Sequence, residues 1–255
     1  MSMEHLENEL RRTLDPRKQA FADVIAGIHK SLGTDIPFPS VAAPLERQTV
    51  ETPEPKLETE RVYPEISLEA EWQRQGQRYI ELGFHTELKI IESEYLASLP
   101  KFTPQPESFK ERLDTPVMVE TRVPIKRQYE LAGIAYHLEG SDKSDWAKDP
   151  KKYKTPDSPY TVWLDEGARD MNRKVEDVRK KLAGDERGGT EFDAIALYIA
   201  KPNILEKRFL DLPGTTVGSG DAACLYLWLG GPRLGCRFVG GAYPRFGSLV
   251  CGRQK

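Results

Sequence analysis

The fold is decided by the stretch Leu210-Asp-Leu-Pro-Gly-Thr-Thr-Val-Gly-Ser-Gly-Asp221, which runs directly into the apolar segment Ala222-Ala-Cys-Leu-Tyr-Leu-Trp-Leu229. Half of the twenty glycines of the chain lie between residues 212 and 252, where they alternate with residues that favour strands. This pattern predicts short strands joined by tight turns. The glycines at 214–220 predict a plain hairpin or Ω-loop rather than a phosphate loop, because no Lys-Ser or Lys-Thr pair follows them and Asp221 would repel phosphate.

The same part of the chain is electrically one-sided. From residue 222 to the C-terminus there are five basic side chains and no acidic one, whereas the preceding residues hold 32 basic and 40 acidic side chains. In a protein of net charge −3, this contrast predicts a surface for an anion. We expect a C-terminal sheet to present four arginines to the ligand and two aromatic side chains for stacking or shape, namely Arg233, Arg237, Arg245, Arg253, Trp228 and Tyr243.

Composition limits the class of protein. The chain has 255 residues, of which 38% are hydrophobic and 30% are charged, so part of it is expected to lie outside any core. Its longest uncharged apolar run, at 222–229, is far shorter than the roughly 20 residues of a membrane helix, and the N-terminus lacks an export-signal pattern. Three cysteines without a Cys-x-x-Cys pair fit a reducing compartment and predict no metal site. We therefore expect a cytoplasmic protein with no membrane span and no cofactor.

The first quarter of the chain predicts an appendage to the main domain. A helix begins at Asp15-Pro16 and ends at Gly33, and its narrow apolar stripe needs a docking surface on its own domain, on a second copy or on another protein. Six prolines between residues 34 and 64 predict an extended linker. We therefore expect a helical arm at 1–33, a Pro-rich linker at 34–64 and a single domain at 65–255, with a protein partner or self-association through residues 16–32.

Within the domain, the pattern predicts helices first and strands last. Ser67 is placed to cap a helix through Leu82, and a second helix is expected to start at Thr86. A polar segment at 139–159 predicts either a functional lid or a disordered loop, and Trp146 within it favours the lid. The remaining expected elements are helices at 124–131, 172–182, 190–200 and 204–208, and strands or strand-like turns at 117–123, 132–138 and 160–164. This order predicts an α+β fold in which helices precede a small, mostly antiparallel C-terminal sheet.

Several motifs resemble those of a known family. They are Val123-Pro124, Gln128, Leu131-Ala-Gly-Ile134, Ile195-Ala-Leu-Tyr-Ile199, Leu212-Pro-Gly-Thr215, Leu227-Trp228, Gly231-Pro-Arg-Leu234 and Phe246-Gly-Ser-x-x-Cys251. Over about residues 71–253 the chain is similar to a family of bacterial proteins defined as a domain of unknown function. The resemblance implies no activity, cofactor or catalytic residue, and it does not extend to the arm and linker.

The residues leave three functional hypotheses open. The first is a non-enzymatic binding module whose basic, glycine-rich C-terminal sheet and 211–221 loop hold an anionic ligand or partner, nucleic acid included. The second is a cysteine-dependent enzyme with its site near Cys251 or Cys236, with His137 as base, under the 139–159 loop. The third is an assembly protein that docks through the N-terminal helix. The sequence does not decide whether the protein is an enzyme.

Overall fold

The computed structural model describes residues 67–145 and 154–253. The expected arm at 1–33, the expected linker at 34–64 and Trp146 of the expected lid lie outside the described residues. The helices are α3 (Leu68–Glu81), α4 (Phe84–Glu87), α5 (Glu92–Ser98), the 3-10 turn η1 (Glu107–Phe109), α6 (Ile125–Leu131), α7 (Val175–Lys181), α8 (Glu191–Ala200) and α9 (Ile204–Lys207). The strands are β1 (Thr115–Val119), β2 (Ala135–Tyr136), β3 (Lys143–Asp145), β4 (Tyr160–Asp165), β5 (Glu186–Gly188), β6 (Phe209–Val217), β7 (Asp221–Trp228), β8 (Gly231–Phe238), β9 (Phe246–Ser248) and β10 (Val250–Gly252).

The strands form two sheets, and the chain passes directly from one to the other between β9 and β10. The four-stranded sheet has the order β1-β4-β10-β5, and the six-stranded sheet has the order β2-β8-β7-β6-β3 with β9 paired to β6. Strands β9 and β10 follow each other with only the buried Leu249 between them, so a single extended segment belongs first to one sheet and then to the other. The long meander β6-β7-β8 is the largest part of the six-stranded sheet, and its pairing is antiparallel throughout.

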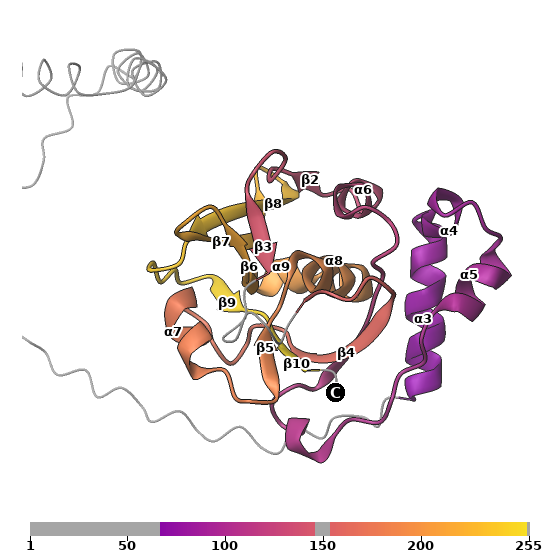
Figure 1. Cartoon of the computed structure of the whole chain (residues 1–255), viewed down its shortest axis with the longest axis horizontal. Coiled ribbons are helices and arrows are strands. Elements are labelled where there is room, and N and C mark those ends of the chain that lie inside the picture. The colour runs from indigo at the N-terminus through magenta and orange to yellow at the C-terminus, as the bar shows by residue number, and fades with distance from the viewer. Residues whose placement is uncertain (1–66, 146–153, 254–255) are drawn as a thin grey trace, which may run out of the picture. The chain divides into compact units, whose positions relative to one another are not determined.

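Helix α8 is the centre of the core. It contacts β1 of the four-stranded sheet as well as β6 and β7 of the six-stranded sheet, and Figure 1 shows it in the middle of the domain. Its N-terminus is a capping box, in which the Thr190 hydroxyl accepts from the Asp193 backbone N–H and the Asp193 carboxylate accepts from the Thr190 N–H. Asp193 also pairs with Arg187 at 2.6 Å, with both side chains buried. The apolar residues that follow the cap are buried because two sheets cover them.

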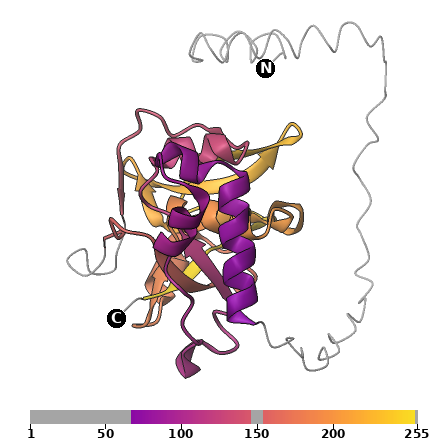
Figure 2. The same ribbon diagram turned by 90° about the vertical axis from the view of Figure 1, so that its right-hand side faces the viewer.

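Helix α3 closes the edge of the four-stranded sheet. Ser67 caps it, accepting from the Ala70 N–H, as the sequence predicts. The Gln75 amide then donates to Pro116 O at 2.9 Å and accepts from Met118 N at 2.9 Å, which satisfies backbone groups of the edge strand β1. Figure 2, which faces α3, shows this helix lying over the body of the domain.

The α+β class is confirmed, but the expected order of elements is wrong. Strands begin at β1, before α6, and helices α7, α8 and α9 lie between strands, so there are two sheets rather than one small C-terminal sheet. The expected helix from Thr86 is broken at Leu88–Ile91, where Lys89 has a φ of 58°. The expected 211–221 loop is also wrong, because residues 209–217 form the buried strand β6 and only the turn at 218–220 separates it from β7. Of the two alternatives predicted for residues 214–220, a plain hairpin or an Ω-loop, the structure has the hairpin.

No helix within residues 67–145 and 154–253 has the length and apolar character that crossing a membrane requires.

Candidate binding surface

The meander β6-β7-β8 has one buried and one open face. Residues alternate between the faces, and directly paired residues of neighbouring strands point the same way. Leu225 and its partner Leu234 are fully buried in the core beside α8. Tyr226 and its partner Arg233 therefore point to the opposite side, where both are partly exposed. We call this side the outer face and define it by Phe209, Tyr226, Trp228, Arg233, Arg237, Tyr243, Arg245 and Phe246.

A row of aromatic rings crosses the outer face. The ring centroid of Phe209 lies 6.3 Å from that of Tyr226 and 5.2 Å from that of Phe246, and the Phe246 centroid lies 5.9 Å from that of Tyr243. All three pairs are edge-to-face, the arrangement that the ring quadrupole favours. The row ends at Tyr243, which is 43% exposed, and Trp228, in the same strand as Tyr226 and near the β7-β8 turn, is 57% exposed.

Arg237 is part of the framework of this face. Its guanidinium donates to both carboxylate oxygens of Asp211, which is fully buried, and to Gly241 O at 3.0 Å. The rings of Tyr243 and Phe246 enclose it, with their centroids 4.3 and 4.6 Å from its Cζ. Burial raises the pKa of Asp211 although Arg237 opposes that shift. Each of the three guanidinium nitrogens of Arg237 makes one of these hydrogen bonds and Asp211 pairs with its charge, so the expected contact with a ligand is not favoured for this residue.

Unlike that of Arg237, the side chains of Arg245 and Arg233 are not paired with a carboxylate of the described residues. Arg245 is exposed, and its guanidinium carbon lies 4.3 Å from the centroid of the Phe209 ring. Stacking of this kind orders a planar guanidinium while its N–H donors still face solvent. Arg233 lies opposite Tyr226 in the pairing of β7 with β8 and is partly exposed. Neither arginine has an ion-pair partner among the described residues, so their charges remain available to an anion.

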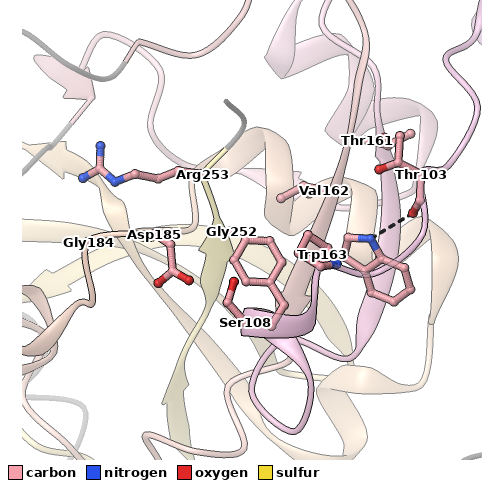
Figure 3. A pocket seen from close by; sticks show the side chains of 11 residues that line it. Thr103, Ser108, Thr161, Val162, Trp163, Gly184, Asp185, Gly252 and Arg253 are labelled. Carbon is pink, nitrogen blue, oxygen red and sulfur yellow. Dashed lines mark hydrogen bonds between the residues drawn. The ribbon is translucent and has the colours of Figure 1, made fainter.

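Arg253 lies away from the other three arginines. Its Nε donates to Glu186 O at 2.9 Å, and its side chain lines a hollow of about 770 Å³ beside the four-stranded sheet. Figure 3 shows its guanidinium pointing away from Trp163, whose indole donates to Thr103 O at 3.2 Å. Arg233, Arg237, Arg245 and the two aromatic residues therefore lie on one surface, whereas the fourth arginine belongs to a different part of the fold.

The three thiols are not in the environment of an activated nucleophile. Cys224 and Cys251 are buried, and burial raises the pKa of both. Cys236 is exposed, but partial burial and the neighbouring Asp221, whose carboxylate lies 3.6 Å from its sulfur, raise its pKa too. His137 is bonded through its backbone N–H to Leu234 O, and no described interaction joins its ring to a thiol. The described residues also include no group of three or more His, Cys, Asp and Glu side chains that could hold a metal ion.

One basic region was not predicted from the sequence. Between Arg169 and Lys181 there are six basic and three acidic side chains, and this segment leads into and forms α7. Its charged residues surround a hollow of about 450 Å³ that also reaches Ala242, next to Tyr243 of the outer face. A net-charge count over windows of about 13 residues identifies this region, whereas the absence of acidic residues marks only the C-terminus.

Comparison with family models, with curated proteins and with solved structures found no match. The resemblance to the domain-of-unknown-function family over residues 71–253 therefore stays a prediction. What the described residues define is a mixed helix-and-sheet domain whose candidate site is the outer face.

Proposed function

We propose that this protein is a non-enzymatic binding module that holds an anionic partner on the outer face. The observation that carries the proposal is the pairing of two arginines that lack a carboxylate partner in the described structure, Arg233 and Arg245, with the exposed rings of Trp228 and Tyr243. Guanidinium groups bind phosphate and carboxylate with two parallel hydrogen bonds, and exposed rings accept a planar group by stacking. A framework arginine, Arg237, keeps the rings in position.

The side-chain chemistry of the outer face and of the thiols supports binding rather than catalysis. An enzyme needs a nucleophile or an acid-base pair with a pKa suited to the reaction, whereas the thiols have raised pKa values. The outer face instead offers donors and rings without a described acid or base among them, apart from the buried Asp211. We also propose a cytoplasmic location, which the three cysteines and the absence of a described disulfide support.

The test is retention of the full chain on a heparin column, with Arg233→Ala/Arg245→Ala compared with the unchanged protein. We expect the double variant to elute at clearly lower salt while its thermal unfolding midpoint stays the same, because neither arginine is buried. The matched control is Arg78→Ala/Lys110→Ala, which removes two exposed basic side chains from other elements. Equal elution of the two double variants would remove the outer face as the anion site.

A further inference from the structure

We infer that the anionic partner is a single-stranded nucleic acid whose backbone crosses the outer face and enters the basic hollow beside α7. This inference rests on the proposed function and names its ligand. The hollow has a volume of about 450 Å³. It is lined by four basic side chains, one acidic side chain and two neutral residues, namely Arg173, Lys174, Lys180, Lys181, Asp177, Asn172 and Ala242.

The charges around the hollow are only weakly neutralised. Arg173 lies 3.4 Å from the Asp170 carboxylate, Lys180 lies 3.5 Å from that of Asp177, and Lys174 lies 3.9 Å from that of Glu176. The Lys174 and Lys180 pairs are exposed, and exposed pairs at these distances contribute about 0–1 kcal/mol, so they are easily exchanged for a phosphate; the Asp170 side chain is only 13% exposed, so the Arg173 pair is not of this kind. Lys181 is exposed and has no ion pair with any residue in 67–145 or 154–253. The hollow therefore keeps an excess of positive charge.

The hollow and the outer face form one continuous surface. Asn172, which lines the hollow, donates its backbone N–H to Phe246 O at 2.8 Å. Met171 forms an isolated antiparallel β-bridge with Gly247 of β9. Residues 171–174 therefore run beside β9 as the next segment after it. Across the surface the order is β8 with Arg233, β7, β6, β9 with Phe246, and then the basic segment.

The dimensions of this surface suit a short single strand. Neighbouring strands lie roughly 4.8 Å apart, so the five segments from β8 to residues 171–174 span roughly 19 Å. A nucleic-acid strand advances about 3.4 Å per stacked nucleotide, and the surface would therefore follow about five or six nucleotides. Both cations and rings lie along it, which suits a ligand that carries phosphates and bases.

The exposed rings favour a single strand over a duplex. In a duplex the base faces stack on each other and are closed to side chains, whereas unpaired bases can stack on aromatic rings. Trp228 and Tyr243 lie at opposite ends of the outer face, and each exposes its ring. An acidic peptide would satisfy the arginines but would leave these two rings without a stacking partner.

The experiment measures fluorescence anisotropy of labelled oligothymidylates, four and twelve nucleotides long, with the full chain over a series of salt concentrations. Lys174→Gln/Lys181→Gln should lower the slope of log K against log salt for the longer strand by about 1.4, because each phosphate contact on a single strand contributes about 0.7. Its affinity for the shorter strand should not change, because that strand is covered by the outer face alone. Trp228→Ala/Tyr243→Ala should weaken both strands about tenfold or more without changing the slope.

The outcomes separate this inference from the function on which it rests. If Arg233→Ala/Arg245→Ala weakens both strands and Lys174→Gln/Lys181→Gln leaves the slope for the longer strand unchanged, the track into the hollow is wrong and the proposed function stands. If neither double variant changes binding, both are wrong. A twelve-base-pair duplex or a polyglutamate of equal charge that binds as tightly as the longer oligothymidylate would overturn the single-strand assignment.

Discussion

Replacing Arg237 with Met tests whether this arginine supports the sheet or serves a ligand. Methionine keeps most of the length of the side chain and removes its charge. In the folded protein Asp211 is fully buried and both of its carboxylate oxygens accept from Arg237, whose side chain is 9% exposed. Breaking a buried pair by removing one partner costs about 3–5 kcal/mol. Since a domain is stable by only about 5–15 kcal/mol, we expect a large fall in the urea midpoint.

The loss of stability should depend on pH, and the sign follows from Asp211. Burial already raises the folded-state pKa of this carboxyl above its ordinary value of 3.8. A carboxyl with a raised folded pKa is stabilising in its protonated form, so its favourable contribution is present below its unfolded pKa and is lost as the pH rises through the folded pKa. Without Arg237 the folded pKa rises further, and this loss extends to higher pH. The loss of unfolding free energy in Arg237→Met, relative to the unchanged protein, should therefore be larger at about pH 8 than at about pH 5.

The double variant Arg237→Met/Asp211→Asn provides the control. Asparagine cannot ionise, so the double variant should recover part of the unfolding free energy and show no difference in its deficit between the two pH values. Urea denaturation followed by tryptophan fluorescence measures the unchanged protein and both variants. If Arg237→Met is as stable as the unchanged protein but binds heparin less well, Arg237 is a ligand contact and the framework role argued from its geometry is refuted.

Three further predictions concern the sheet contacts, the thiols and the stacked arginine. Gly188→Ala should lower the unfolding free energy by about 1–3 kcal/mol, because the added Cβ would lie 2.5 Å from Gly214 N, whereas Gly184→Ala has open space; equal urea midpoints would contradict the close approach of β5 and β6. Iodoacetamide near neutral pH should modify Cys236 first and the other two cysteines only on unfolding, because they are buried. Rapid native-state labelling of a buried thiol would support the thiol-enzyme hypothesis instead. Arg245→Lys should keep the salt slope of oligothymidylate binding but weaken affinity several-fold, because lysine keeps the charge and loses the planar stack on the Phe209 ring. An unchanged anisotropy titration would show that stacking does not organise this cation.

The local elements were predictable where the signal is local. Ser67 and Thr190 begin α3 and α8 as expected, because a capping side chain acts within three residues of its own position. The division into two sheets was not predictable from such signals. It depends on Leu249, where one extended segment leaves β6 and joins β4 and β5, and those partners are distant in sequence. Strand β3 was expected to be part of a loop for the same reason, since its polar residues are ordered by pairing with β6.

The difference between local signals and contacts distant in sequence also applies to the site. Arg233 and Arg237 share a face because they are an even number of positions apart in one strand, and the two-residue period of a strand is visible in the sequence. The partner of Arg237 was not visible, because Asp211 precedes it by 26 residues and meets it only through the pairing of β6, β7 and β8. Arg253 was grouped with them because it lies in the same acid-free segment, although β10 carries it to the other sheet.

The strength of an anion site on this protein depends on which cations remain unpaired, more than on how many the segment contains. Arg237 illustrates the difference, since a buried carboxylate already cancels its charge at short range. At physiological salt a charge acts over about 8 Å, so the cations that matter to a ligand are those within one or two strand spacings of each other. Arg245, stacked on Phe209 of β6, lies two strand spacings from Arg233 on β8 and two from residues 171–174, so each of these cations has a neighbour within that range, whereas Arg253 follows a strand of the other sheet. Removing Arg253 should therefore leave the salt slope unchanged, although its charge equals that of Arg245.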